Sequence, residues 1–215
     1  MTHKAIILDL DDTIFRTKSM DGKVFQPFFN HLSSNLKPSF GEDTIEQIIS
    51  DLWEQTWDKV ISKYDIPLEI IVDSTKILDS LELPLEISPY PDYSFLKNLP
   101  IPKYLVTTSL TSLQKAKISA LKIDNDFEKI IINDTFRESK TKLDIFRELL
   151  AEFGLVPECT YVIGDNADSE IRAGNELNMV TIQILREGVV KGDNAKHHIR
   201  SFDELGPIIN QYNFQ

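Results

Sequence analysis

The chain has 215 residues, of which 41% are hydrophobic and 27% are charged. This length and composition are typical of a globular protein that buries a sizeable core and holds one domain with a modest insertion. The formal net charge of −11 argues against a nucleic-acid partner, because the sequence has no basic stripe that could neutralise phosphates.

The sequence also argues against a membrane partner. No apolar run approaches the roughly 18 residues of a membrane span. The chain enters a predicted strand directly, without the charged and then apolar segment of a secretory signal. Cys159 is the only cysteine, so no internal disulfide can form. We expect a cytoplasmic protein, either a monomer or a homodimer.

The first predicted element is the apolar run Ala-Ile-Ile-Leu at residues 5–8, which is typical of a strand buried on both faces. Three carboxylates follow within four positions, at Asp9, Asp11 and Asp12. Carboxylates at the carboxyl end of a buried strand lie where open α/β sheets bind their ligands, and they suit a hard cation such as Mg²⁺. Taken alone, this run fits a solvated acidic turn almost equally well.

Residues 25–87 are predicted to be helical, because their apolar residues recur at steps of three and four. One helix is expected over 27–36, one or two more over 45–64, and another from Pro67, a residue tolerated in the first turn of a helix. Trp53 and Trp57 could stack on an aromatic substrate. Packing inside a helical bundle is the favoured interpretation of such an i, i+4 pair.

The two prolines of residues 88–92 predict a linker, after which helices and strands alternate. The expected elements are a helix over 93–99, a strand over 103–106, a helix over 110–121, a strand over 127–132, a helix over 139–153, a strand over 161–163 followed by a helix, a strand over 179–185, and a closing helix from 202. His197 and His198 are expected in a polar loop. This alternation predicts a parallel sheet covered by helices.

Polar residues follow several of these strands or open a helix, in a fixed order along the chain. They are Asp9, Asp11 and Thr13 after the first strand, Thr107 after the second, Lys140 at a helix start with Phe146 six residues later, and Gly164, Asp165 and Glu170 after the fourth strand. The set resembles the four motifs of the haloacid dehalogenase superfamily. The resemblance covers roughly residues 1–18 and 88–212, and the helical insertion resembles the small C1-type cap of one subclass.

The resemblance implies an α/β fold, a three-layer Rossmann-like sandwich with a five-stranded parallel sheet. Residues 1–18 and 88–215 would form the catalytic core, and residues 19–87 a helical-bundle cap that selects the substrate. The implied activity is Mg²⁺-dependent hydrolysis of a small-molecule phosphomonoester through an aspartyl-phosphate intermediate.

The resemblance also implies roles for individual residues. Asp9 would be the nucleophile and Asp11 the general acid and base. Mg²⁺ would bind the carboxylates of Asp9 and Asp165 and the backbone carbonyl of Asp11. Thr13 in the first motif favours a hydrolase over a mutase.

Other matching residues would bind phosphate or support the site. Thr107 and Lys140 would bind phosphate together with Thr108, which stands where the family usually has Asn. The expected supporting residues are Thr13, Gly164, Asn166 and Glu170.

Two residue assignments and the reaction class stay open at the level of sequence. Lys142 competes with Lys140, which is preferred for its spacing to Phe146, and Asp168 competes with Glu170. A phosphomutase and a non-catalytic phosphate-binding protein are the alternative functions. A response-regulator receiver is disfavoured, because it is about half this length and has no helical insertion after the first strand.

Overall fold

The computed structural model describes residues 4–53, 55, 57–80, 86–134 and 140–212, and its centre is a sheet of six parallel strands. The strands are β1 (Ala5–Leu8), β2 (Lys103–Thr108), β3 (Lys129–Asn133), β4 (Thr160–Gly164), β5 (Val180–Ile184) and β6 (His197–Ile199). Their order across the sheet is β3-β2-β1-β4-β5-β6, with all neighbours parallel. The first strand therefore lies in the middle, between the two strands whose ends carry Thr107 and Asp165.

The predicted parallel α/β class is confirmed, but the expected strand count of five is wrong. The sixth strand pairs with β5 through the register Ile182↔His197 to Ile184↔Ile199. His197 and His198 therefore lie in an edge strand and not in a loop. A three-residue strand that begins with two histidines has no apolar run, so hydrophobic patterning cannot detect it.

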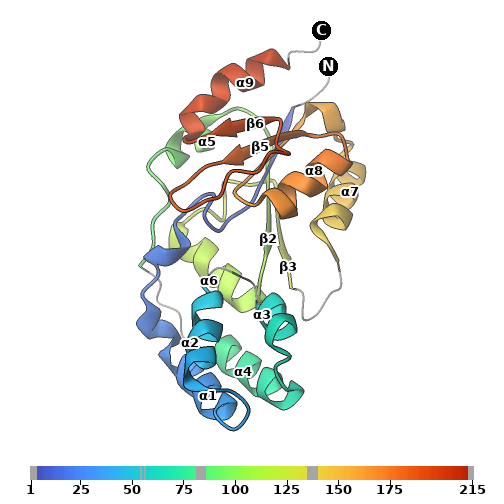
Figure 1. Cartoon of the computed structure of the whole chain (residues 1–215). Helices are drawn as coiled ribbons and strands as arrows, with labels where there is room; N and C mark the ends of the chain where they lie inside the picture. The colour runs from blue at the N-terminus through green and yellow to red at the C-terminus, as the bar shows by residue number, and fades with distance from the viewer. Residues whose placement is uncertain (1–3, 54, 56, 81–85, 135–139, 213–215) are drawn as a thin grey trace.

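Helices cover both faces of the sheet (Figure 1). The helices are α1 (Gln26–Leu36), α2 (Glu42–Asp51), α3 (Trp57–Tyr64), α4 (Leu68–Ser80), α5 (Tyr93–Asn98), α6 (Thr111–Leu121), α7 (Lys142–Phe153), α8 (Arg172–Glu176) and α9 (Leu205–Gln211). Ile6 and Leu8 of β1 share a core cluster with α5, α6 and α9. Ala5 and Ile7 belong to a second cluster with α7 and α8. Successive residues of a strand point to opposite faces, so β1 contributes to both cores.

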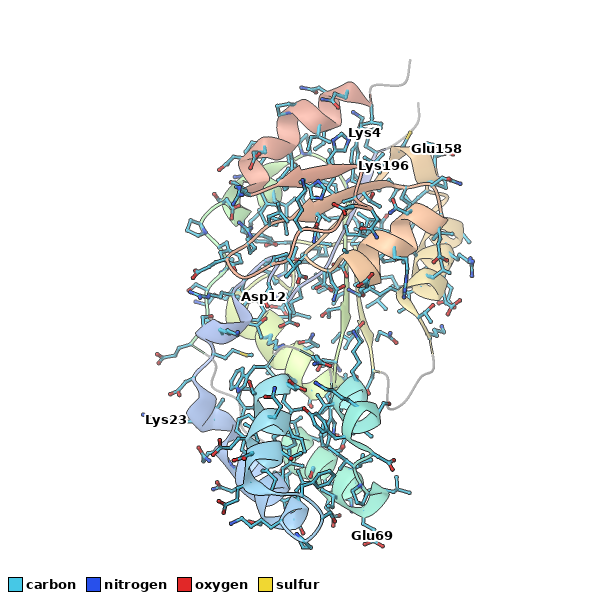
Figure 2. The ribbon with its side chains drawn as sticks, viewed as in Figure 1. Lys4, Asp12, Lys23, Glu69, Glu158 and Lys196 are labelled. Atoms are coloured by element: carbon cyan, nitrogen blue, oxygen red, sulfur yellow. The ribbon has the colours of Figure 1, made fainter. Side chains whose placement is uncertain are left out.

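The carboxyl ends of the strands point toward the cluster formed by α1, α2, α3 and α4 (Figure 1). Figure 2 labels Lys4, Glu158 and Lys196, which precede β1, β4 and β6, at the end of the sheet remote from these helices. Asp12, which follows β1, lies at the end that faces them. The expected site residues therefore meet between the sheet and the helical cluster.

The helical cluster has an apolar interior that is continuous with the core around Ile6 and Leu8 of β1. Its buried side chains include Leu32 and Leu36 of α1 and Ile48 of α2. Trp57 is also buried, with its ring 5.7 Å from that of Phe28 in an edge-on contact. The bundle-packing interpretation of Trp57 is thus confirmed.

The two segments that connect the sheet with the helical cluster, around Ile14 and around Tyr90, are joined by hydrogen bonds. The Tyr90 backbone N–H donates to the Ile14 carbonyl at 2.8 Å. Arg186 donates to Asp92 at 2.8 Å and to the Thr13 carbonyl at 3.2 Å, and its guanidinium lies 4.0 Å from the centre of the Tyr90 ring. These contacts fix the point where the chain leaves the core and the point where it returns. None of the helices in the described part of the chain has the length and apolarity to span a membrane.

Candidate active site

The chain turns sharply just after β1. The Ile14 backbone N–H donates to the Leu10 carbonyl at 2.9 Å, and Asp12 adopts a left-handed conformation with φ of 49°. Asp tolerates this region because its side chain can bond nearby backbone, and here Asp12 accepts from the Thr17 N–H at 2.9 Å. The turn brings both Asp9 and Asp11 to the wall of one cleft.

This cleft has a volume of about 610 Å³ and lies between the strand ends and the helical cluster. Most of the expected site residues line it, namely Asp9, Asp11, Thr107, Thr108, Asp165, Asn166 and Glu170. Thr13 and Gly164, which were expected to support the site, are buried and are not among the described residues that line the cleft. Lys140 is not among the described residues that line the cleft.

Asp9 is buried in contact with a lysine and close to other acids. Lys142 Nζ lies 2.6 Å from Asp9 Oδ1 and 2.8 Å from Glu170 Oε2. Burial raises the pKa of Asp9 to about 7; Lys142 opposes the rise and Glu170 adds to it. Burial alone would lower the pKa of Lys142, but the charges of Asp9 and Glu170 raise it above its ordinary value. Lys142 is therefore a fixed cation beside the expected nucleophile.

The preference for Lys140 over Lys142 is therefore wrong. Lys140 is exposed and pairs with Glu148 at 2.9 Å. The N-cap of α7 is Thr141, whose hydroxyl accepts from the Asp144 N–H in a capping box, so Lys140 precedes the helix. Lys142 and the buried Phe146 are four residues apart and share the face that turns toward the sheet. The Thr-x-x-Asp capping signal was present in the sequence and marks this helix start.

Three carboxylates converge at a point suited to a divalent cation. Oxygen atoms of Asp9, Asp165 and Glu170 all lie within 4.8 Å of one another. Burial, followed by the charges of Glu170 and Asp9, raises the pKa of Asp165 to about 9. One lysine cannot neutralise three acids, so the group favours an additional cation, and oxygen-only ligands suit Mg²⁺. The donor set therefore fits the metal that the motifs imply.

Glu170 links the turn after β4 to Lys142 of α7 through hydrogen bonds. Its Oε1 accepts from the Asn166 backbone N–H at 2.7 Å while its Oε2 accepts from Lys142. A Cβ on Gly164 would lie 2.1 Å from Glu170 Oε1, so only glycine leaves space for this carboxylate. This close approach is the structural reason for glycine at position 164. Glu170 is buried and Asp168 is exposed, which favours Glu170 as the second acid of the last motif.

Sequence reasoning missed the residues that surround Asp11. Lys117 Nζ donates to Asp11 Oδ1 at 2.6 Å, Gln114 Nε2 donates to Oδ2 at 2.8 Å, and Thr17 Oγ1 lies 3.3 Å from Oδ1. Burial would raise the pKa of Asp11, but these three partners outweigh it and hold the pKa below its ordinary value. The available signal was a glutamine and a lysine at inward positions of an otherwise apolar helix face.

The part of the cleft nearest the helical cluster is aromatic. Phe25, Phe28, Phe29, Trp53 and Trp57 line it, and their rings contact one another at centroid distances of 5.4–6.3 Å. Gln55 and Lys59 add polar groups to the wall. A ligand that reaches this far from Asp9 would therefore meet mostly apolar surface.

Comparison with known proteins gives relatives that span nearly the whole chain. A glyceraldehyde 3-phosphate phosphatase of Methanocaldococcus jannaschii is 26% identical, with 96% of each chain covered. Among solved structures, CbbY of Rhodobacter sphaeroides in complex with phosphate is similar at a TM-score of 0.67 and 20% identity, covering 95% of this chain and 97% of that one.

Two further solved structures have the same fold. A phosphatase of Thermococcus onnurineus is similar at a TM-score of 0.65 and 20% identity, with 96% of this chain and 97% of that chain covered. The magnesium-bound hydrolase YfnB of Bacillus subtilis is similar at a TM-score of 0.64 and 17% identity, with 98% and 100% covered. The model of the haloacid dehalogenase-like hydrolases matches residues 6–184. The chain therefore belongs to the haloacid dehalogenase-like hydrolase family.

Proposed function

We propose that this enzyme is a Mg²⁺-dependent phosphatase that hydrolyses a small-molecule phosphomonoester through an aspartyl-phosphate on Asp9. The observation that carries the proposal is the buried Asp9 carboxylate, which lies against Lys142 and within reach of two more acids at the wall of the cleft. A carboxylate held beside a fixed cation can accept a phosphoryl group that would otherwise repel it.

The metal would be held by Asp9, Asp165 and the backbone carbonyl of Asp11. When bound, Mg²⁺ supplies positive charge that offsets the negative charge of the transferring phosphoryl group. The metal and Lys142 supply the positive charge close to the phosphate, so binding of an anionic substrate does not require a basic surface patch. The acidic net charge of the chain is therefore compatible with such a substrate.

The remaining roles belong to side chains of the cleft wall. Asp9 attacks phosphorus, while Lys142 offsets the repulsion between the carboxylate and the phosphate. Thr107 and Thr108 would donate their hydroxyl hydrogens to phosphoryl oxygens. Asp11 would protonate the leaving oxygen and later take a proton from the water that hydrolyses the aspartyl-phosphate.

Residues 1–18 and 88–215 would form the catalytic core, and residues 19–87 a cap that excludes water and selects the leaving group. The Methanocaldococcus jannaschii relative is named for glyceraldehyde 3-phosphate, so this triose phosphate is the first metabolite to test. A small phosphate ester is the proposed partner.

The test is phosphate release from p-nitrophenyl phosphate and a panel of metabolite phosphates, with Mg²⁺ or with EDTA. Uncatalysed phosphomonoester hydrolysis is so slow that even weak turnover exceeds the background. We expect release that needs Mg²⁺ and is abolished by Asp9→Asn. Asp168→Asn is the matched control, because Asp168 lines the same cleft but lies outside the carboxylate group. It should retain activity.

The intermediate has a separate test. Beryllofluoride should form an adduct on Asp9 in the presence of Mg²⁺, detectable by mass spectrometry under native conditions or by ¹⁹F NMR. An adduct on another carboxylate would contradict the assignment of the nucleophile. A folded protein that releases phosphate from no ester would contradict the phosphatase itself.

A further inference from the structure

Two buried polar side chains of helix α6, Gln114 and Lys117, contact Asp11. Helix α6 begins after the second motif, and none of its residues belongs to the four motifs. Lys117 has a side chain only 5% exposed, and its Nζ lies 2.6 Å from Asp11 Oδ1. The ring of Phe15 lies 5.8 Å from the same ammonium. A buried cation needs a close partner to offset its desolvation, and Asp11 is that partner.

Gln114 is fully buried and joins two site residues. Its Nε2 donates to Asp11 Oδ2 at 2.8 Å and to Thr107 Oγ1 at 2.6 Å. The opposite orientation of the amide would set its oxygen against the Asp11 carboxylate, so the amino group must face this side. Each of the two amide hydrogens therefore has one acceptor.

This arrangement has a consequence for Thr107. Since its hydroxyl oxygen accepts from Gln114, its own hydrogen is directed elsewhere, and Thr107 lines the cleft. A phosphoryl oxygen bound there would receive that hydrogen. The Gln114 side-chain amide thus orients both the Asp11 carboxylate, which accepts from it, and the Thr107 hydroxyl, whose own hydrogen remains free to be donated.

Packing alone does not account for the two residues. Apolar side chains of similar volume would fill these positions without the desolvation of a lysine and an amide. Gln114 Oε1 is moreover buried without a hydrogen-bond partner among the described residues, a further cost of keeping an amide here. The hydrogen bonds that offset these costs lead to Asp11 and Thr107.

We propose that Gln114 and Lys117 are positioning residues of this enzyme. Together they hold both oxygens of the Asp11 carboxyl group in place for its proton transfers, and Gln114 also orients the Thr107 hydroxyl. The inference rests on the proposed function, because it assigns Asp11 the proton transfers of phosphoester hydrolysis.

The step that should depend on Lys117 is the departure of the leaving group. The bond between phosphorus and the ester oxygen breaks as the Asp9 oxygen bonds to phosphorus. The electron pair of the broken bond stays on the ester oxygen, which takes a proton from Asp11. Asp11 is paired with the Lys117 cation in the free enzyme, so it takes up this proton from solvent when the anionic ester binds. An alkoxide leaving group needs this proton, whereas p-nitrophenolate is stable without it.

The experiment compares kcat/KM for an alkyl ester, such as glycerol phosphate or glyceraldehyde 3-phosphate, with kcat/KM for p-nitrophenyl phosphate. This parameter reports the steps up to phosphoryl transfer to Asp9. Lys117→Met leaves Asp11 able to take up a proton but removes the contact that holds its carboxyl group in place. It should therefore lower kcat/KM by about 10²-fold or more for the alkyl ester and far less for the aryl ester. Lys117→Arg should restore much of the loss, because it keeps the cation beside Asp11.

Lys115→Met is the matched control, since Lys115 is exposed on the same helix and should show the wild-type ratio of the two substrates. Gln114→Met should lower kcat/KM for both esters, because it also affects the Thr107 contact with the phosphoryl group. An equal loss on both esters in Lys117→Met would reduce Lys117 to a structural residue and overturn its role.

A double-mutant comparison keeps the proposal testable if Lys117→Met is poorly folded. In an Asp11→Asn background the buried charge pair is already broken, and Lys117→Arg should then leave the alkyl-to-aryl ratio unchanged. A further change in that ratio would mean that Lys117 acts independently of Asp11, contrary to the proposal. Wild-type protein without activity on any ester would instead contradict the phosphatase itself, so the two failures are distinguishable.

Discussion

The two ends of the cleft differ in the way their side chains are held. At the sheet end, Asp9 and Asp11 each contact a lysine whose side chain is no more than 10% exposed. At the helical end, the wall is formed mainly by rings that contact one another, such as Phe25 and Trp53. Buried charges tolerate little displacement, because each depends on a partner at hydrogen-bond distance, whereas apolar contacts are non-directional.

This difference suggests that the sheet end carries out the chemistry and the helical end selects the substrate. Chemistry at phosphorus needs charges at fixed positions, and the sheet end supplies them from strand ends and helix starts that are anchored in the core. Selection of a leaving group needs a surface of suitable size and polarity, which the helical end supplies. Substitutions beside Asp9 should therefore affect all substrates, and substitutions at the helical end should affect only those whose leaving group reaches the aromatic wall.

The largest expected effect in this comparison is that of Lys142→Met. Removing the cation beside Asp9 should lower kcat by about 10²- to 10³-fold for every ester, as loss of a charge-stabilising group does in other enzymes. The measurement is steady-state phosphate release with saturating Mg²⁺. Lys140→Met is the matched control, since Lys140 lies outside the cleft, and it should stay near wild type. A larger loss of kcat in Lys140→Met than in Lys142→Met would contradict the assignment of Lys142 as the cation beside Asp9.

An intermediate effect is expected from Gly164→Ala. The added Cβ would overlap Glu170 and force it away from Lys142 and the Asn166 N–H, so the free energy of unfolding should fall by about 1–3 kcal/mol. Thermal or denaturant unfolding measures the change. Gly206→Ala serves as control, because the nearest atom to its added Cβ is 3.9 Å away and alanine favours α9. Equal stability of the two variants would show that the Glu170 corner is not tightly packed.

The smallest effect should come from Trp53→Ala at the helical end. Trp53 lines the cleft and is partly exposed, so its loss should raise KM for bulky apolar esters by about 10-fold, since a buried aromatic contact contributes about 1 kcal/mol or more. A small ester such as glyceraldehyde 3-phosphate should be hydrolysed with little change. Parallel losses on both esters would contradict the division between the two ends.

Much of the fold was predictable because its signals are local. Apolar runs such as residues 5–8 mark strands, and the alternation of strands and helices predicts a parallel sheet. The same alternation places the acids that follow β1 and β4 at one edge of the sheet, because carboxyl ends of parallel strands share that edge. That these acids meet was implied by the resemblance, and the pairing of β1 with β4 accounts for it. The edge strand β6 escaped prediction, since backbone pairing with β5 forms it and not an apolar run.

The errors at the site have a different origin. Lys140 was preferred over Lys142 on spacing alone, whereas the N-cap at Thr141 decides which lysine faces the sheet. Gln114 and Lys117 contact Asp11 across 103 and 106 positions of sequence. No local pattern encodes a contact over that distance, although polar residues on an apolar helix face could have drawn attention to α6.

The sequence by itself thus determined the fold class, the edge of the sheet that bears the site and the carboxylates Asp9, Asp11 and Asp165. The fold class and the edge of the sheet follow from periodicity and from residue order along single strands, which are local properties of the chain. The three carboxylates follow from the resemblance to the haloacid dehalogenase motifs. Only the tertiary structure decided that Lys142 faces Asp9, that Glu170 needs the space at Gly164, and that α6 holds Asp11. Those choices depend on how separate elements pack against one another, because a side chain finds its partner only after the core has oriented its helix.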